Sequence, residues 1–391
     1  QDERGGESIE ALVDELHAPL LRWLEDIEAV HLTAAELAPS PWSGPSWPLC
    51  RGMIGSRYAD PELPAAQDFH AHRLYVCERP LASVARDGVQ TEVDLLSPAE
   101  KYDLLLGELQ APLTAATWQK GRVVYEREGR VPPWLGIGHG WAPAAFMLPR
   151  PLRTVLLPGA TTRYHLTFFP SDLKALASLL WAEAPAVRSL GGREIDPGTF
   201  HLAMVNQVGA AARSLIIDAS ADPAIWNQPV LGYSYAYFNP LTRQATRTLH
   251  HAVVKRSAFA EDPFKDRRSP GCLSLVGIAM DVVYLVETPP SHSFSDSPDR
   301  DRRLSVRYLY DLELDLQGRV IGGAWYTNAP PDLLWAPPPD TVPRSPVDVI
   351  ATGAWKLPRG LPDSWREAGL IAAQQGRPLS QIVNALFSLA R

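Results

Sequence analysis

Cysteine is scarce in this sequence, since its 391 residues include three: Cys50, Cys77 and Cys272. Three thiols cannot build a disulfide framework; one pair can bridge, with Cys50–Cys77 favoured, and one thiol is left over. Positively charged residues are also fewer than negatively charged ones: there are 37 Lys and Arg and 44 Asp and Glu. This balance argues against a nucleic-acid partner, which a basic face would bind.

Long apolar runs are missing too. The best one, Leu273 to Val286, is interrupted by Asp281 and is shorter than the roughly 20 residues of a membrane span. Proline, by contrast, is abundant at 37 residues, which is about twice its usual share and disfavours long helices. The polar start at Gln1, without Met, is typical of a chain trimmed of a targeting segment, so we expect a secreted or periplasmic protein.

Periodicity and capping signals predict helices at both ends and strands in the centre. Apolar positions 9, 12, 13, 16, 20, 21 and 24 follow a helical period. Helix starts follow at Ser97-Pro98, at Pro170-Ser171, at Ser364 and after Pro378. Segments rich in β-branched and aromatic residues predict strands at 199–206, 213–218, 229–238, 248–256, 272–287, 304–315 and 318–326.

This order of elements predicts an α+β fold with a mostly antiparallel sheet. We expect three segments: a helical and Trp/Pro-rich segment (1–95) packed on the core, the core itself (96–340), and a C-terminal helical extension (341–391).

The most unusual string is the glycine-rich stretch 134–146, which contains Gly138, His139 and Trp141. It predicts a tight turn entering a short helix, with Pro143 in the first turn. Helix N-termini lower a thiol's pKa and bind oxyanions. The alternative, which the pattern alone favours, is a structural turn packed under Trp141.

A second string predicts a pair of polar side chains. If Gly209 and Ala210 form the turn of a hairpin, His201 lies opposite Asp218 on the same face. A histidine beside a carboxylate is the base-and-orienter pair of Cys–His–Asp or Ser–His–Asp sites. A buried pair that only joins two strands would look the same. Just beyond, Trp226 and Asn227 form either part of a substrate groove or a self-bonded turn.

Together these strings resemble the elicitor-type transglutaminase family of oomycetes. The resemblance runs from about residue 40 to 336, in order as well as content, and is carried by Pro41-Trp42-Ser43-Gly44, Trp47-Pro48, 136–145, 171–176, Trp226-Asn227-Gln228-Pro229-Val230 and 322–335.

The resemblance implies a papain-like core that transfers the acyl group of a protein glutamine to a primary amine such as lysine. His201 would be the general base and Asp218 its orienter, and His139, Trp141, Trp226 and Asn227 would contact the substrate. No cofactor is required. Calcium dependence is possible, but the sequence does not support it, because the acidic stretch 291–301 lacks the spacing of a calcium loop. Secretion is also implied.

The chain departs from the family at one position, because Gly138 stands where the nucleophilic cysteine is expected. Without a nucleophile the first covalent step cannot occur, so we expect an inactive protein. The glycine is either a natural loss or a deliberate substitution. A non-enzymatic binding protein that uses the retained cleft is the second hypothesis, and a papain-like hydrolase is the third.

Overall fold

The computed structural model describes residues 20–183, 188–191, 195–219, 224–357 and 359–391. The chain divides into two compact units. Unit 1 comprises residues 1–41, 186–286 and 302–341, and unit 2 comprises 42–185, 287–301 and 342–391. The expected segments 1–95, 96–340 and 341–391 do not coincide with these units. Residues 34–36 join the sheet of unit 1, whereas 42–95 and 342–391 pack with the central helices of unit 2.

Unit 1 is built on one antiparallel sheet. Its main path runs β11-β10-β9-β6-β5-β12-β4, while β1 and β7 pair with β6 and β8 pairs with β9. The strands are β1 (Ala34–Glu36), β4 (Arg188–Gly191), β5 (Ile216–Asp218), β6 (Gln228–Phe238), β7 (Ala245–Thr246), β8 (Val253–Lys255), β9 (Ser274–Val286), β10 (Arg302–Leu314), β11 (Val320–Trp325) and β12 (Leu333–Ala336).

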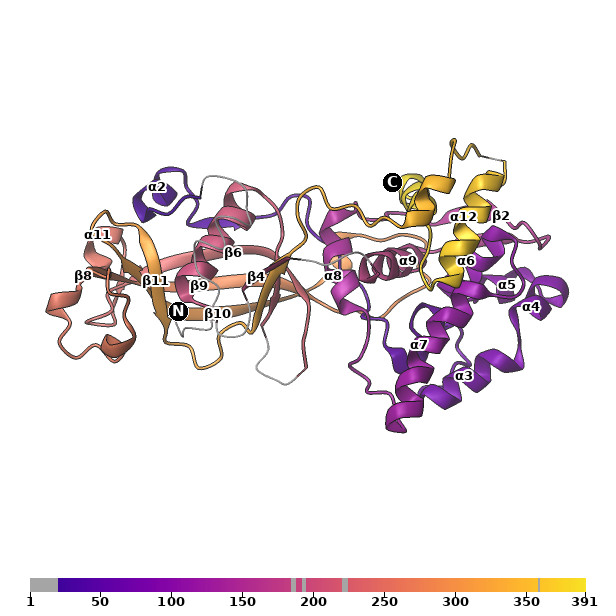
Figure 1. Cartoon of the computed structure of the whole chain (residues 1–391), viewed down its shortest axis with the longest axis horizontal. Helices are drawn as coiled ribbons and strands as arrows, with labels where there is room; N and C mark the ends of the chain where they lie inside the picture. The colour runs from indigo at the N-terminus through magenta and orange to yellow at the C-terminus, as the bar shows by residue number, and fades with distance from the viewer. Residues whose placement is uncertain (1–19, 184–187, 192–194, 220–223, 358) are drawn as a thin grey trace. The chain divides into compact units, whose positions relative to one another are not determined.

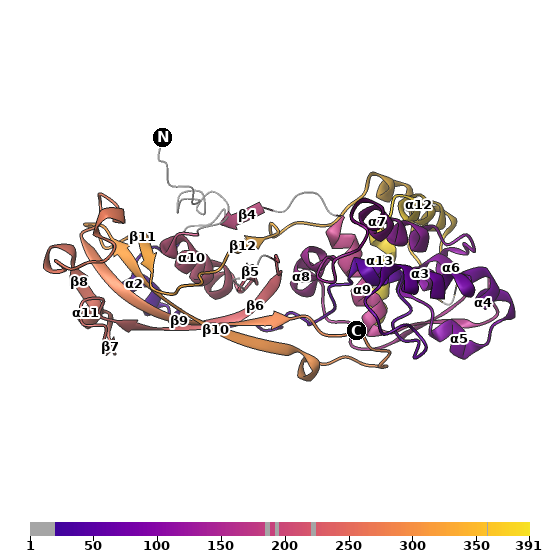
Figure 2. The same cartoon turned by 90° about the horizontal axis from the view of Figure 1, so that it is seen from below.

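The helices of unit 1 are short: α2 (Leu24–Ala29), α10 (Pro197–Ala203) and α11 (Leu249–Ala252). Figure 2 shows α10 lying on one face of the long strands β9 and β10. Alternate residues of β6, Tyr233, Tyr235 and Tyr237, join Tyr308 and Tyr310 of β10 in the core beneath α10. Period-2 alternation places these aromatic rings on one face of the sheet.

The strand predicted at 199–206 is wrong, because these residues begin in α10 and continue into a π-helix, Met204–Ala210. Asp196 caps the helix by accepting hydrogen bonds from the N–H groups of Gly198 and Thr199, at 2.8 and 3.1 Å. Pro197 occupies the first helical position, where its fixed φ fits and its missing N–H costs nothing. Capping therefore outweighs the strand propensity of the residues that follow.

Most other predictions in the centre are confirmed. Strands β6, β9, β10 and β11 match the predicted segments within about two residues, and β10 and β11 form the hairpin whose tip is 316–319. Of 248–256, only 253–255 is a strand, after the helical turn α11. Of 213–218, only 216–218 is a strand. The helical period starting at position 9 lies largely outside the described residues.

Unit 2 is mostly helical (Figure 1). Its helices are α3 (Phe69–Glu78), α4 (Leu81–Asp87), α5 (Gln90–Asp94), α6 (Pro98–Leu106), α7 (Pro112–Glu128), α8 (Gly138–Met147), α9 (Pro170–Ala182), α12 (Asp363–Gln374) and α13 (Ser380–Leu389), and its hairpin joins β2 (Val155–Pro158) to β3 (His165–Phe168). The four predicted helix starts are confirmed, and at α6 Ser97 and Glu100 form the expected capping box.

The favoured bridge between Cys50 and Cys77 is not formed, because Cys50, Cys77 and Cys272 are all free thiols. Cys50 is buried and Cys77 is exposed. No helix among the described residues is long and apolar enough to cross a membrane.

Helices α8 and α9 pack closely because Gly140 has no side chain. A Cβ atom at position 140 would lie 2.1 Å from the Ser178 carbonyl oxygen and 2.6 Å from the Ala182 nitrogen, and neither backbone atom can move without shifting α9. The glycine therefore sets how closely the start of α8 approaches α9.

We expect Gly140→Ala to lower the free energy of unfolding by about 3 kcal/mol, because overpacking here meets backbone. Thermal unfolding followed by calorimetry measures the effect. Gly360→Ala is the control, since a Cβ there meets nothing within 4 Å. Equal melting temperatures for the two variants would contradict this account of the helix packing.

Candidate functional site

The glycine-rich turn enters a helix, as the sequence predicts. Gly138 is the first residue of α8, and Ile137 precedes it without a side-chain cap. The Ile137 N–H donates to the Ser46 carbonyl at 2.7 Å, which fixes the turn. Within the described part of the chain, the backbone N–H groups of Gly138 and His139 have no acceptor. Two orphan donors at a helix N-terminus form a site suited to negative charge.

Pro143 lies one turn further into α8 than expected, as its sixth residue. Trp141 is buried, with 1% of its surface exposed. Its indole N–H donates to the Trp42 carbonyl at 3.3 Å, and Gly44 lies against the same ring. The ring packs under the Trp42–Gly44 segment, which agrees with the structural alternative for this string, and substrate contact by Trp141 stays a prediction.

That segment is held in place by Lys174 of α9. The Lys174 ammonium donates to the Ser43 carbonyl at 2.7 Å and pairs with Asp296 at 2.8 Å. It also lies 5.2 Å from the centre of the Trp42 ring. Residues 42–44 are thus held in place over α8.

His139 lies beside the end of α9. Its ring is hydrogen bonded to the Ala182 carbonyl, and partial burial lowers the pKa of His139, against the opposing effect of Glu183. Glu183 itself forms an ion pair with Lys120 of α7. His139 is exposed, so a polar group at the start of α8 is accessible to solvent.

His201 lies in the core of unit 1, with none of its surface exposed. Its Nδ1 is 2.8 Å from the Tyr310 hydroxyl, and its buried Nε2 has no hydrogen-bond partner in the part of the chain that the structure describes. The Tyr235 ring contacts it edge-on, with ring centres 4.9 Å apart. Burial lowers the pKa of His201 to about 3, so the imidazole is neutral at physiological pH.

The hydrogen bonds favour one tautomer of this neutral ring. If Nδ1 carries the proton and donates to Tyr310, the Tyr310 hydroxyl is free to donate to the Met280 sulfur, 3.8 Å away. The unpartnered Nε2 is then an acceptor, which costs less than a buried N–H without an acceptor. This tautomer leaves Nε2 with a free lone pair.

The predicted pairing of His201 with Asp218 across a hairpin is wrong. His201 belongs to a helix, and Asp218 at the end of β5 faces Leu333 of β12 in the sheet register. Tyr310 takes the position next to His201 that was expected for Asp218. The sequence predicts the strand 304–315 that contains Tyr310. It gives no signal that Tyr310 contacts His201, which was assigned to a different strand.

Asp218 instead holds the segment that contains Trp226. Its carboxylate accepts a hydrogen bond from the backbone N–H of Trp226 at 3.0 Å. Asn227 accepts from the Trp335 indole at 3.1 Å, and Gln228 accepts from the Ala219 N–H at 2.9 Å. These bonds agree with the self-bonded turn, one of the two alternatives for this string. Trp226 is half-buried, and Ile225 beside it is exposed.

No group of three or more His, Cys, Asp or Glu side chains in the described ranges is placed to hold a metal ion.

The burial of His201 predicts acid sensitivity. Its folded-state pKa of about 3 lies below the ordinary value near 6.5, so the unfolded chain binds a proton first as pH falls. Stability from this group is complete above about pH 6.5 and is lost toward pH 3, with about 2 kcal/mol lost between pH 7 and 5. Urea unfolding at both pH values should show that His201→Asn lacks this loss.

Tyr310→Phe is the matched control for that prediction. It removes the hydrogen bond but leaves the buried imidazole, so stability falls at both pH values and the pH dependence remains. An unchanged pH dependence in His201→Asn would show that other groups cause the acid sensitivity.

Comparisons with known proteins agree with the resemblance seen in the sequence. A family model described as transglutaminase elicitor matches residues 23–192 and 186–353. The solved structure of the GP42 transglutaminase from Phytophthora sojae is similar in fold, with a TM-score of 0.60 and 21% identity over 94% of this chain and 99% of that chain. No curated protein matches the sequence. Since the family model covers most of the chain, this protein belongs to the transglutaminase elicitor family.

Proposed function

We propose that this chain carries the scaffold of a protein-glutamine acyltransferase and is inactive as written, because Gly138 occupies the nucleophile position. The observation that carries the proposal is the start of α8, where Gly138 is the first residue and the N–H groups of Gly138 and His139 have no acceptor among the described residues. A thiol at this position would be activated by the helix N-terminus. The same N–H groups would stabilise an oxyanion.

In this proposal the thiolate attacks the carboxamide carbon of a protein glutamine. The tetrahedral oxyanion is bound by the N–H groups of positions 138 and 139, ammonia leaves with a proton from the base, and a thioester remains. A lysine amine then gives its proton to the base and opens the thioester, forming an isopeptide bond. The reaction is complete without a cofactor, so we propose that neither calcium nor another metal is needed.

His201 is the proposed base, with Tyr310 rather than Asp218 as its orienting partner. The free lone pair on Nε2 and the hydrogen bond on Nδ1 support this role. A papain-like relation is proposed from the family resemblance, with the nucleophile position at the start of α8 and the histidine in α10, a helix that packs on the sheet. Asp218 is proposed to position the Trp226–Asn227 segment, and His139 remains the proposed substrate contact at the start of α8. Secretion is proposed from the family alone.

The second candidate is a binding protein without catalysis. The exposed Ile225 beside the half-buried Trp226, on a segment fixed by three hydrogen bonds, favours recognition by a protein partner. Hydrolysis, in which water replaces the amine, is the third candidate and has no observation of its own in the structure.

We expect Gly138→Cys to incorporate a fluorescent primary amine into a glutamine-rich donor protein, and the unmodified chain to incorporate none. Gly138 is a helical residue and is not among the glycines with positive φ, so a side chain there causes no backbone strain. A gel-based labelling assay with and without a chelator measures transfer and metal dependence together. Ammonia release without labelling would instead indicate hydrolysis.

Two further variants separate the roles. Adding His201→Ala to the Gly138→Cys chain should abolish labelling, because the base is lost. Gly360→Cys controls for an added thiol elsewhere, since that position is open. Labelling by the unmodified chain would place the nucleophile elsewhere, and absence of labelling in every variant would favour the binding protein.

A further inference from the structure

Unit 2 contains a cavity of about 410 Å³. Three segments form its walls: the end of α6 with Gly107 and Glu108, residues 158–161 between β2 and β3, and Trp355 and residues 359–361 with Arg366 in the first turn of α12. The volume is within the range of sites that bind small molecules. No residue of α8 lines it, so it is separate from the proposed catalytic position.

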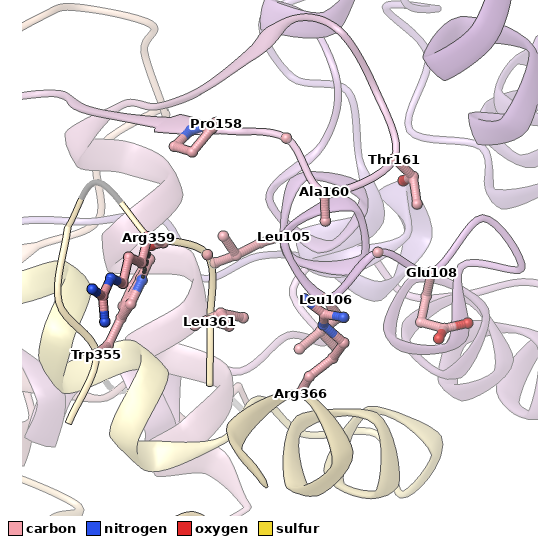
Figure 3. A pocket seen from close by; sticks show the side chains of 13 residues that line it. Leu105, Leu106, Glu108, Pro158, Ala160, Thr161, Trp355, Arg359, Leu361 and Arg366 are labelled. Atoms are coloured by element: carbon pink, nitrogen blue, oxygen red, sulfur yellow. Dashed lines mark hydrogen bonds between the residues drawn. The ribbon is translucent and has the colours of Figure 1, made fainter. Parts of the chain in front are cut away.

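The floor of this cavity is apolar. Leu105, Leu106 and Leu361 are all buried, and their side chains face the space in Figure 3. Trp355 adds an indole at one side. Its N–H donates to the Arg359 carbonyl at 3.0 Å, which closes the loop that carries both residues. An apolar body of a ligand would find contacts here on several sides.

Two guanidinium groups lie at the same cavity. Arg359 follows Trp355 in the chain and Arg366 lies in the first turn of α12, and Figure 3 shows Arg359 beside Trp355 and Arg366 beside Leu106. Neither guanidinium has an acceptor or an ion-pair partner among the residues that the structure describes. Both arginines are exposed, so their donors are in contact with solvent and accessible to a ligand.

We propose that this cavity binds a small organic anion, with an apolar and preferably aromatic body on the leucine floor and a carboxylate or phosphate group that binds one of the two exposed arginines, Arg359 or Arg366. Arginine presents a planar set of donors that matches both oxyanions, and such bonds are stronger than neutral ones. Glu108, on the opposite side of the cavity from Trp355 and Arg359 in Figure 3, disfavours a second negative group there.

The first test is a titration of the full chain followed by ligand-observed NMR. The probes are phenyl phosphate and 4-phenylbutyrate, compared with 4-phenylbutylamine, which has the same body and the opposite charge, and with inorganic phosphate, which has no body. We expect saturable binding of one or both aromatic anions, and binding at least about tenfold weaker for the amine and for inorganic phosphate. The two aromatic anions distinguish a phosphate site from a carboxylate site.

Variants locate the site. The double substitution Arg359→Gln/Arg366→Gln should weaken binding of the aromatic anion at least about tenfold, whereas Arg130→Gln, an exposed arginine outside the cavity, should not. Ala160→Trp fills the space from an exposed position and should block binding without unfolding the chain. Melting temperatures confirm that the variants are folded.

Three results would overturn the proposal: no saturable binding of either aromatic anion to the folded chain, equal binding of the amine, or unchanged binding by the double variant. Binding of inorganic phosphate as tightly as phenyl phosphate would also overturn it, since the apolar floor would contribute nothing.

Discussion

The start of α8 depends on a single buried cation. Lys174 joins α9 to the segment 42–44 and to Asp296, which lie far apart in the sequence. Burial lowers the pKa of Lys174, and Asp296 opposes this effect. An ammonium without partners would not be tolerated at this depth. Because the cation is paired, Trp42 stays over α8 and Trp141 stays beneath it, so the turn at Gly138 has a fixed support.

The histidine of unit 1 is stabilised in the opposite way. His201 has no charged group as its hydrogen-bond partner, and its neutral form fits a core of tyrosine rings. The close pairing of β10 with β11 depends on Gly323, where a Cβ would lie 2.1 Å from the Asp311 carbonyl oxygen and 3.0 Å from the Pro197 side chain of α10. Packing thus explains the glycine at 323 in the family-like string.

The sequence predicts the parts of this fold that depend on local signals. Ser97 and Glu100 cap α6 as expected, and the alternation along 229–238 matches β6. The predictions fail where a contact between residues far apart in the sequence, or a cap, determines the local structure. Asp196 converts a strand-like segment into α10, and the side chain next to His201 comes from β10, more than 100 residues away. Nor does spacing between Cys50 and Cys77 reveal that the first is buried and the second exposed.

The free thiols have a practical consequence. With Cys50 and Cys272 buried and Cys77 exposed, the native chain offers one readily accessible sulfur for maleimide chemistry. A single dye or spin label can therefore be attached at the end of α3 without first removing other cysteines. Because no cross-link joins distant segments, the protein can also be produced under reducing conditions, such as those of a bacterial cytoplasm.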